Sequence, residues 1–300
     1  MSDWTADDMP NLEGRVAVVT GAISGLGFET ARMLAEHGAT VVMACRDVQR
    51  GKAAADRIKA NVAVQRLDLA SLVSIRDAAE HIRKLHPRID LLVNNAGVMV
   101  PPYTRTEDGF ELQLGVNHLG HFALTGLVLD SLLKTPGSRI VTVSSNGHRM
   151  GRIAFDDLHS ERRYRRVGAY AQSKLANLLF TFELQRRLAA AGASTSALAA
   201  HPGTASTELE RHVSWWMRLP GLVVPRHAVA IAALPTLRAA TDPEARGAEY
   251  YGPGGRGGFT GHPVRVEPHS RAHDTEVQRR LWEESERLTG VGYVLDRARS

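Results

Sequence analysis

Short runs of apolar residues alternate with longer stretches of helical periodicity along most of this chain. The run from Arg15 to Thr20 is almost wholly apolar and stops at a glycine, which predicts a buried strand. Apolar residues then recur at helical spacing from Gly25 to Glu36, and Gly38 ends the predicted helix. The same alternation predicts strands at 40–44, 62–67, 89–93, 139–143, 195–200 and 249–251, and helices at 71–85, 112–133, 168–190, 227–240 and 274–288.

This alternation indicates the fold class. Apolar strands separated by helices build parallel sheets that are covered on both faces. We therefore expect an α/β fold, a single doubly wound (Rossmann-type) domain with a mostly parallel sheet of about seven strands and helices on both faces. The domain is expected to span residues 12–300, after a flexible N-terminal tail at 1–11.

Two segments interrupt the alternation. Residues 146–167 are polar and rich in arginine, and we expect them to be a surface insertion. Residues 208–226 contain Trp215, Trp216 and Met217, a group that either forms a lid over a substrate or packs in the core. The glycine-rich stretch at 252–261 is expected to be a loop.

Composition and charge narrow the class of protein. Hydrophobic residues make up 43% and charged residues 23%, as is typical of a soluble globular protein. The net charge is +5, but the densest basic cluster, at 161–166, is short and contains an acid, so we expect a solvated surface and no nucleic-acid partner. No apolar run reaches the roughly 18 residues that a membrane span needs. The single cysteine, Cys45, excludes an internal disulfide and fits a cytoplasmic protein.

The turn between the first strand and the first helix is rich in glycine. Residues 20–27 read T-G-A-I-S-G-L-G, a G-x-x-x-G-x-G spacing that differs from the common G-x-G-x-x-G. Glycine lets the backbone turn sharply and lets a pyrophosphate approach the helix N-terminus, where free N–H groups favour anions. The position of the turn between a buried strand and an amphipathic helix predicts a dinucleotide site.

The end of the second strand bears on which dinucleotide binds. NAD enzymes usually place an acid there for the ribose 2′-hydroxyl, whereas NADP enzymes offer a cation to the 2′-phosphate. Arg46 ends this strand and Arg50 follows shortly, and a guanidinium can pair with phosphate through two hydrogen bonds. Asp47 is the complication, because it would take the ribose role if the strand ended one residue later. We expect NADP rather than NAD, although Arg46 could also be an ordinary exposed arginine.

Three separated features carry residues suited to catalysis. Tyr170 and Lys174 are four residues apart and share one face of a predicted helix. Ser145 follows the fifth strand, and Asn117 lies in the long helix before it, where it could also be a buried residue that bonds its own helix. A tyrosine–lysine pair alone often arises by chance, but together with the serine and the glycine turn it is specific. The histidines show no metal-ligand spacing with acids or cysteines, so we expect no metal.

Together these motifs resemble the short-chain dehydrogenase/reductase family, over roughly 12–293. The shared motifs are T-G-x-x-x-G-x-G at 20–27, D-L at 68–69, N-N-A-G at 94–97, asparagine at 117, serine at 145, Y-x-x-x-K at 170–174 and P-G at 202–203. The chain most resembles the retinol-dehydrogenase-like branch, through A-C-R at 44–46, F-D-D-L at 155–158, Q-S-K-L-A-N at 172–177 and A-A-T-D-P at 239–243. Ser145 and Tyr170 are farther apart than in the shortest family members, which fits an insertion between them.

The resemblance implies a role for each of these residues. Tyr170 would exchange the proton with the substrate oxygen, and Lys174 would lower the tyrosine pKa and hold the cofactor ribose. Ser145 would hydrogen-bond the substrate oxygen, and Asn117 would hold a water that relays protons. The implied cofactor-binding residues are Gly21, Ser24, Gly25, Leu26, Gly27, Arg46, Asp68, Leu69, Asn95, Ala96, Gly97, Tyr170, Lys174, Pro202, Gly203 and Thr207. The implied substrate contacts are Ser145, Tyr170, Trp215, Trp216 and Met217.

The function implied is that of an oxidoreductase that transfers hydride between NADP(H) and a lipophilic alcohol or carbonyl compound. One alternative is a non-catalytic NADP-sensing regulator, a class that typically loses the tyrosine or the lysine, both present here. Another is a relative of the epimerase or dehydratase kind, against which Gly25 and Gly27 argue. The N-terminal membrane anchor of many animal retinol dehydrogenases is not seen, so we expect a cytoplasmic, bacterial-type relative. Family members often pair through the helices of Asn117 and Tyr170, which leaves a homo-oligomer open.

Overall fold

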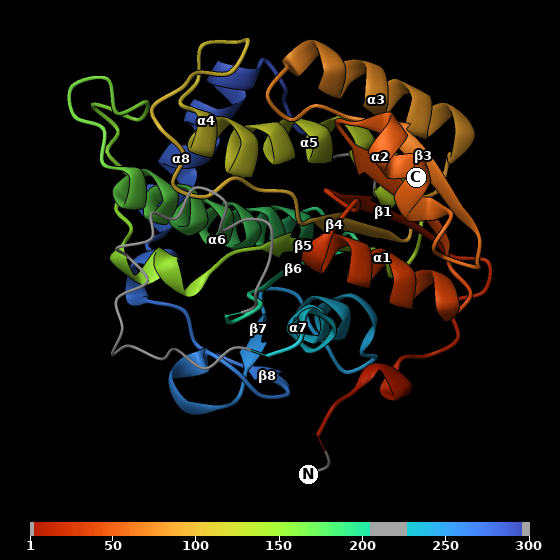
Figure 1. Cartoon of the computed structure of the whole chain (residues 1–300). Helices are drawn as coiled ribbons and strands as arrows, with labels where there is room; N and C mark the ends of the chain where they lie inside the picture. The colour runs from red at the N-terminus through yellow and green to blue at the C-terminus, as the bar shows by residue number, and fades with distance from the viewer. Residues whose placement is uncertain (1–2, 205–226, 296–300) are drawn as a thin grey trace.

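The protein was analysed as a computed structural model that describes residues 3–204 and 227–295 (Figure 1). The strands are β1 (Val16–Thr20), β2 (Thr40–Cys45), β3 (Val62–Arg66), β4 (Leu91–Asn94), β5 (Arg139–Val143), β6 (Ser196–Ala200), β7 (Tyr250–Pro253) and β8 (Pro263–Arg265). The helices are α1 (Gly25–Glu36), α2 (Val48–Ala55), α3 (Leu72–Leu85), α4 (Leu112–Leu114), α5 (Gly120–Leu133), α6 (Arg166–Ala190), α7 (Val229–Thr241) and α8 (Thr275–Thr289). None of the described helices combines the length and apolarity needed to cross a lipid bilayer.

All eight described strands belong to one sheet, in the order β3-β2-β1-β4-β5-β6-β7-β8. The first seven pair in parallel, and β8 runs antiparallel to β7 at the edge. The chain begins at β1, extends the sheet to β3 on one side, and then crosses to β4 on the other. The doubly wound fold predicted from the alternation of strands and helices is therefore confirmed, with the switch in strand order between β1 and β4.

Helices cover both faces of the sheet. Figure 1 shows α3 and α5 on one side, and α1 and α7 on the other. Successive residues of β1 alternate between the two layers, because side chains along a strand point to opposite faces. Ala17 and Val19 join the core beneath α1 and α7, whereas Val18 joins the core beneath α3 and α5. A strand buried in this way must be apolar at every position, which explains the continuous apolar runs in the sequence.

Several elements differ from the sequence-based expectation. The long helix expected at 112–133 consists of α4, a π-helical turn at Gly115–Leu119 and α5. In the middle turn the Gly120 N–H bonds the Gly115 carbonyl, an i→i+5 hydrogen bond in place of the usual i→i+4 bond. Helix α2 and strand β8 were not expected, since both are short and weakly periodic. Strand β7 continues to Pro253, into the stretch expected to be a loop. The segment expected as an insertion begins with a 3₁₀-helix at Asn146–Met150 and continues as a projecting loop before α6, drawn in green in Figure 1.

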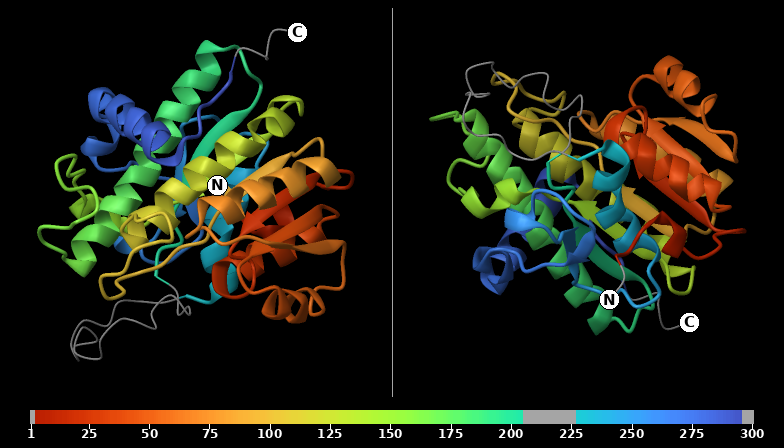
Figure 2. Two further views of the ribbon diagram at one scale, coloured as in Figure 1. Left: turned by 90° about the horizontal axis from the view of Figure 1, so that it is seen from above. Right: turned by 60° about the horizontal axis from the view of Figure 1, so that its bottom comes forward.

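The C-terminal helix α8 packs beside α6, as Figure 2 shows. Its Trp282 is 2% exposed and contacts the rings of Phe122, Phe180 and Tyr293. The Arg187 guanidinium lies 4.4 Å from the centre of the Trp282 ring. These aromatic contacts join α5, α6 and α8 into one layer and so support the helices that carry the candidate catalytic residues.

Replacing Trp282 with alanine should lower the free energy of unfolding by about 3–5 kcal/mol, since it removes a fully buried aromatic side chain. Urea denaturation followed by circular dichroism measures this change. Val73→Ala on α3 is the matched control, because Val73 is 67% exposed, and it should change stability by less than about 0.5 kcal/mol. A loss of less than about 1 kcal/mol for Trp282→Ala would show that α8 contributes little to this layer.

Candidate active site

The glycine turn connects β1 to α1, as the sequence predicts. Gly21 and Gly25 have φ angles of +68° and +56°, in the left-handed region that side chains other than glycine rarely adopt. Gly27 has no room for a side chain, because an added Cβ would collide with the Gly21 carbonyl and the Asn95 side-chain amide. Each glycine is thus required by the backbone path, and the turn leaves the N-terminus of the 12-residue helix α1 facing the carboxyl edge of the sheet.

Thr20, the last residue of β1, ties this turn to the end of β4. Its hydroxyl oxygen accepts hydrogen bonds from the backbone N–H groups of Asn95 and Ala96, both at 2.9 Å. The Asn95 side chain donates in return to the Thr20 carbonyl at 2.8 Å. The segment Asn95–Gly97 therefore lies directly against the glycine turn, and the preceding Asn94 is a buried residue that bonds Thr125 on α5.

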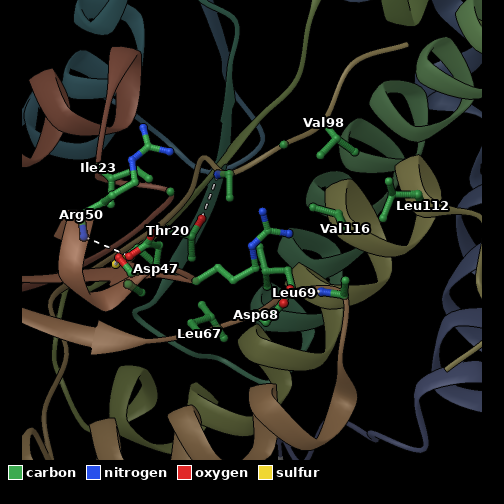
Figure 3. A pocket seen from close by; sticks show the side chains of 17 residues that line it. Thr20, Ile23, Asp47, Arg50, Leu67, Asp68, Leu69, Val98, Leu112 and Val116 are labelled. Carbon is green, nitrogen blue, oxygen red and sulfur yellow. Dashed lines mark hydrogen bonds between the residues drawn. The ribbon is translucent and has the colours of Figure 1, made fainter. Parts of the chain in front are cut away.

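A cavity of about 310 Å³ opens along the carboxyl ends of β1 to β4 (Figure 3). Of the residues expected to bind a cofactor, it is lined by Gly21, Arg46, Asp68, Leu69, Ala96 and Gly97. Ser24, Gly25, Leu26 and Gly27 lie at the start of α1 and do not line it. The sequence analysis missed the apolar lining residues Ile23, Leu67, Val98, Leu112 and Val116. Leu67 adjoins the D-L motif and could have been found, whereas Leu112 and Val116 come from a separate helical segment with no local signal.

The arginine and the aspartate at the end of β2 have different surroundings. Asp47 accepts a hydrogen bond from the backbone N–H of Arg50 at 3.0 Å and thereby caps the N-terminus of α2, as the dashed line in Figure 3 shows. Arg46 is exposed, lines the cavity, and makes no hydrogen bond or ion pair with any described residue. A carboxylate that caps a helix is already engaged, whereas the Arg46 guanidinium is available to a ligand.

Ser145 and Tyr170 meet beyond the end of β5. Ser145 is the N-cap of the 3₁₀-helix, and its hydroxyl accepts a hydrogen bond from the Gly147 N–H at 3.1 Å. A Cβ on Gly147 would lie 3.2 Å from the Tyr170 ring and 3.5 Å from the Ser145 hydroxyl oxygen, so the two side chains flank the same glycine. Burial raises the pKa of Tyr170, and a hydrogen bond with Ser145 acts weakly in the opposite direction.

Lys174 lies one helical turn after Tyr170 and is 3% exposed. Its ammonium donates a hydrogen bond to the Val143 carbonyl at 3.1 Å and sits 5.9 Å from the centre of the Tyr170 ring. The Ser144 hydroxyl donates to the Lys174 carbonyl at 2.8 Å and holds this turn of α6 against β5. Burial lowers the pKa of Lys174 to about 8, because a charged ammonium is costly in an apolar environment.

Asn117 lies in the π-helical turn and is fully buried. Its side-chain oxygen accepts a hydrogen bond from the Val98 N–H at 2.8 Å, and its amide group donates to the Val98 carbonyl at 3.0 Å and to the Ser173 hydroxyl at 2.9 Å. These bonds run to the loop after β4 and to α6, so Asn117 joins three segments of the site. The Asn117 side chain therefore bonds other segments of the chain, and not only its own helix.

Gly97 connects the cavity to the candidate catalytic residues. It lines the cavity, and a Cβ added to it would lie 3.1 Å from the Asn117 side-chain oxygen and 3.6 Å from the Lys174 ammonium nitrogen. The structure therefore brings Asn117, Ser145, Tyr170 and Lys174 to one end of the cavity, although they come from different elements.

The remaining predicted residues lie beyond β6 or outside the described structure. Gly203 has a φ angle of +70°, and a Cβ there would collide with the Phe259 carbonyl. The Pro202 carbonyl accepts a hydrogen bond from the His227 ring at 3.0 Å, which holds this loop near the start of α7. Residues outside the described structure are Thr207, Trp215, Trp216 and Met217, together with the whole segment 208–226 expected to be a lid.

The chain is similar to known proteins in both sequence and structure. A model of the short chain dehydrogenase family matches residues 15–218. Retinol dehydrogenase 13 of Homo sapiens is 43% identical over 93% of this chain and 86% of that protein. Polyprenol dehydrogenase of Mus musculus is 44% identical over 97% of this chain and 88% of that protein. The crystal structure of an uncharacterized protein from Mycobacterium paratuberculosis shares 45% identity and has a TM-score of 0.85, covering 98% of this chain and 100% of that chain.

The family match and the retinol dehydrogenase relatives establish what kind of protein this is. Members of the family are oxidoreductases that use nicotinamide cofactors and act on alcohol or carbonyl groups. The resemblance seen in the sequence motifs is confirmed by both the family model and the relatives. The chain belongs to the short chain dehydrogenase family, in its retinol-dehydrogenase-like branch.

Proposed function

We propose that the protein transfers hydride between NADP(H) and a lipophilic alcohol or carbonyl compound, with Tyr170 as the general acid and base. The observation that carries this proposal is that the cavity reaches Gly97, beside the Lys174 ammonium, which in turn lies 5.9 Å from the centre of the Tyr170 ring. A cofactor lying in the cavity would end beside a hydroxyl group that can exchange a proton with the substrate oxygen.

The residues of the cavity fit a dinucleotide. Gly21 gives the turn its left-handed path and Gly27 lets the turn pack closely, so the N-terminus of α1 faces the carboxyl edge of the sheet, where its partial positive charge favours a pyrophosphate. Asp68 and Leu69 line the cavity and would flank the adenine, and Gly97 would lie along the cofactor ribose. When bound, the cofactor supplies the hydride for carbonyl reduction and takes it up in alcohol oxidation.

Tyr170 is suited to donate a proton in the reductive direction. Because burial raises its pKa above the ordinary value, its hydroxyl remains protonated at neutral pH in the protein alone. In reduction the hydroxyl gives this proton to the carbonyl oxygen as that oxygen gains negative charge. Ser145 donates a hydrogen bond to the same oxygen and stabilises its developing charge.

Lys174 makes the loss of this proton less costly. With a pKa of about 8 it is mostly charged at neutral pH, and its ammonium lies close to the Tyr170 ring. A positive charge there would favour the phenolate over the neutral phenol and so oppose the effect of burial on the tyrosine pKa. Lys174 would also bond the cofactor ribose. Asn117, which is near Gly97 like Lys174, would hold a water that relays protons between the ammonium and solvent.

The preference for NADP rests on the contrast at the end of β2. Arg46 is exposed at the cavity and has no partner among the described residues, whereas the Asp47 carboxylate caps α2. The 2′-phosphate of NADP would pair with the Arg46 guanidinium and bring counter-charge to an otherwise unpaired cation. NAD offers only a neutral 2′-hydroxyl at this position.

The lipophilic nature of the substrate is supported by the names of the relatives and by the apolar residue types at 215–217. Two relatives are named for retinol and polyprenol, which are apolar alcohols. Trp215, Trp216 and Met217 would supply an apolar cover for such a molecule. The alternative function, an NADP-sensing regulator without catalysis, is less well supported because Tyr170 and Lys174 are both present and close together.

Arg46→Asp should weaken binding of NADPH at least about tenfold while changing NADH binding about twofold or less, because it replaces attraction to the 2′-phosphate with repulsion. Fluorescence titration of the reduced cofactors measures both dissociation constants. Lys52→Asp is the matched control: Lys52 is exposed on α2, does not line the cavity, and should leave both constants within about twofold. Equal or tighter binding of NADH by the wild type would contradict the proposed preference.

Tyr170→Phe should lower kcat by roughly 10²–10⁴-fold, because it deletes the general acid and leaves the ring's packing intact. Binding of NADPH should weaken by about fivefold at most, since the hydroxyl is expected to make no more than one hydrogen bond to the cofactor. Lys174→Ala should lower kcat and also weaken NADPH binding, because Lys174 serves both the phenol and the ribose.

Steady-state kinetics and cofactor titration on the same preparations separate these two patterns. Tyr103→Phe is the control, since it makes the same chemical change at a tyrosine that is 39% exposed, and it should leave kcat unchanged. Turnover by Tyr170→Phe within a few-fold of the wild type would refute the assignment of the general acid.

A further inference from the structure

Two buried histidines near the site have no part in the mechanism above. His121 lies on α5 and His148 in the 3₁₀-helix after Ser145, and each is 1% exposed. Each is hydrogen-bonded at both ring nitrogens to groups from different segments of the chain. A buried histidine bonded on both sides fixes the relative position of the two segments that it bonds.

His121 connects Asn117 to the glycine-turn strand β1. Its Nδ1 lies 3.0 Å from the Asn117 carbonyl, which can only accept, so Nδ1 carries the hydrogen. Its Nε2 lies 2.9 Å from the Thr20 hydroxyl, closer than the Val93 carbonyl at 3.4 Å that is the other acceptor for that hydrogen. Thr20 therefore donates to His121 while its oxygen accepts from the backbone N–H groups after β4.

This arrangement engages both the oxygen and the hydrogen of the Thr20 hydroxyl and both ring nitrogens of His121. The Thr20 hydroxyl holds the Asn95–Gly97 segment against the cavity and passes its only hydrogen to His121. His121 in turn holds the backbone of Asn117 in the π-helical turn. The His121 imidazole thus joins the cofactor-binding end of the site to the catalytic end. Thr20 and His121 are 101 positions apart in the sequence.

His148 plays the corresponding part for Ser145. Its Nδ1 donates to the Ser145 carbonyl at 2.6 Å, and its Nε2 accepts a hydrogen bond from the backbone N–H of His269 at 3.0 Å. The same 3₁₀-helix is bonded a second time to this C-terminal segment, because the Arg149 guanidinium donates to the Glu267 carbonyl at 3.0 Å. The turn that presents the Ser145 hydroxyl is therefore anchored to residues 267–269.

Both rings are bonded as neutral imidazoles with the hydrogen on Nδ1. Burial lowers the pKa of each to about 4, and the charges of Lys174 near His121 and Arg149 near His148 act in the same direction. A second hydrogen on Nε2 would face a donor in each case, so the neutral form is also the one that the hydrogen bonds require.

We infer that His121 and His148 are positioning residues for this oxidoreductase: His121 couples the backbone of Asn117 to the Thr20 anchor of the cofactor site, and His148 fixes the turn that carries Ser145. The inference rests on the proposed function, in which Asn117 holds a water that relays protons and Ser145 bonds the substrate oxygen. Neither histidine touches the cavity, so each acts through the residue whose carbonyl it holds.

Paired amide substitutions separate the two bonds of each ring. The amide nitrogen of asparagine falls where Nδ1 lies, and the terminal amide of glutamine reaches the position of Nε2. His121→Asn therefore keeps the bond to the Asn117 carbonyl and loses Thr20, whereas His121→Gln keeps Thr20 and loses Asn117.

For His121 the two variants should fail in different ways. In His121→Gln, kcat should fall at least about tenfold with the NADPH dissociation constant within about twofold, because Asn117 is displaced and the Thr20 anchor is kept. In His121→Asn, the NADPH dissociation constant should rise about fivefold, the worth of one hydrogen bond, with kcat at saturating cofactor within about threefold. Loss of packing alone would not lower kcat in one variant and weaken NADPH binding in the other.

His118→Asn is the matched control, because asparagine loses the bond that Nε2 of His118 makes to Ser285. His118 is equally buried, lies in the same helical turn, and bonds Ser285 on α8 at 2.9 Å, away from the cavity. It should lower thermal stability and leave kcat and NADPH binding within about twofold of the wild type. Changes in kcat or binding as large as those of the His121 variants would show that any buried polar change in this turn has the same effect, and would overturn the inference.

The His148 pair provides an independent test if the His121 variants fold poorly. His148→Asn keeps the bond to Ser145 and should retain kcat within about threefold, whereas His148→Gln loses it and should lower kcat at least about tenfold. NADPH binding, measured by titration, should be unchanged in both. The reverse order of the two variants, or equal losses in both, would contradict the inference.

Failure of this inference is distinguishable from failure of the proposed function. Kinetic assays use NADPH with the aldehyde that the wild type reduces fastest among retinaldehyde, decanal and benzaldehyde. If the wild type reduces no carbonyl compound, the proposed function fails. The difference in NADPH dissociation constant between His121→Asn and His121→Gln would still test whether His121 acts through Thr20. If the wild type is active and the paired variants behave alike, only the positioning role fails.

Discussion

The parallel pairing of β1, β4 and β5 determines where the polar groups of the site can lie. The last residues of these strands are Thr20, Asn94 and Val143. The register of the strands places these three residues at one edge of the sheet. The glycine turn, the Asn95–Gly97 segment and Ser145 all follow directly from these ends. Every further contact of the site depends on this edge, because the helices that carry Asn117 and Tyr170 pack against the same strands.

Burial gives the site its electrostatic character. It raises the pKa of Tyr170, lowers that of Lys174 to about 8 and lowers those of His121 and His148 to about 4. At neutral pH the tyrosine and both histidines are therefore uncharged, and Lys174 carries a positive charge beside the phenol. A single ammonium in an apolar surrounding acts strongly on its neighbour, because little water screens it. The neutral histidines organise the backbone without competing with that charge.

Features encoded by local sequence could be predicted, and features that depend on contacts across the fold could not. The glycine turn and the Tyr170–Lys174 pair each occupy one strand–helix junction or one helix face, so spacing alone indicated them. The π-helical turn at Asn117 was missed because its residues have ordinary helical periodicity. The bond between Thr20 and His121 joins distant segments, and His121 carries no sign of it in the sequence. The short strand β8 was missed because only three residues form it.

The cavity, together with Tyr170 and Lys174 at its end, is proposed to serve hydride transfer with NADP(H). The most direct measurement is turnover by the purified wild-type protein with NADPH and a panel of lipophilic aldehydes and ketones, followed by nicotinamide absorbance and by identification of the product. NADPH oxidation should depend on the carbonyl compound and should yield the matching alcohol in equal amount. Tight binding of NADPH without turnover of any compound in the panel, in either direction, would contradict it and favour a sensing role.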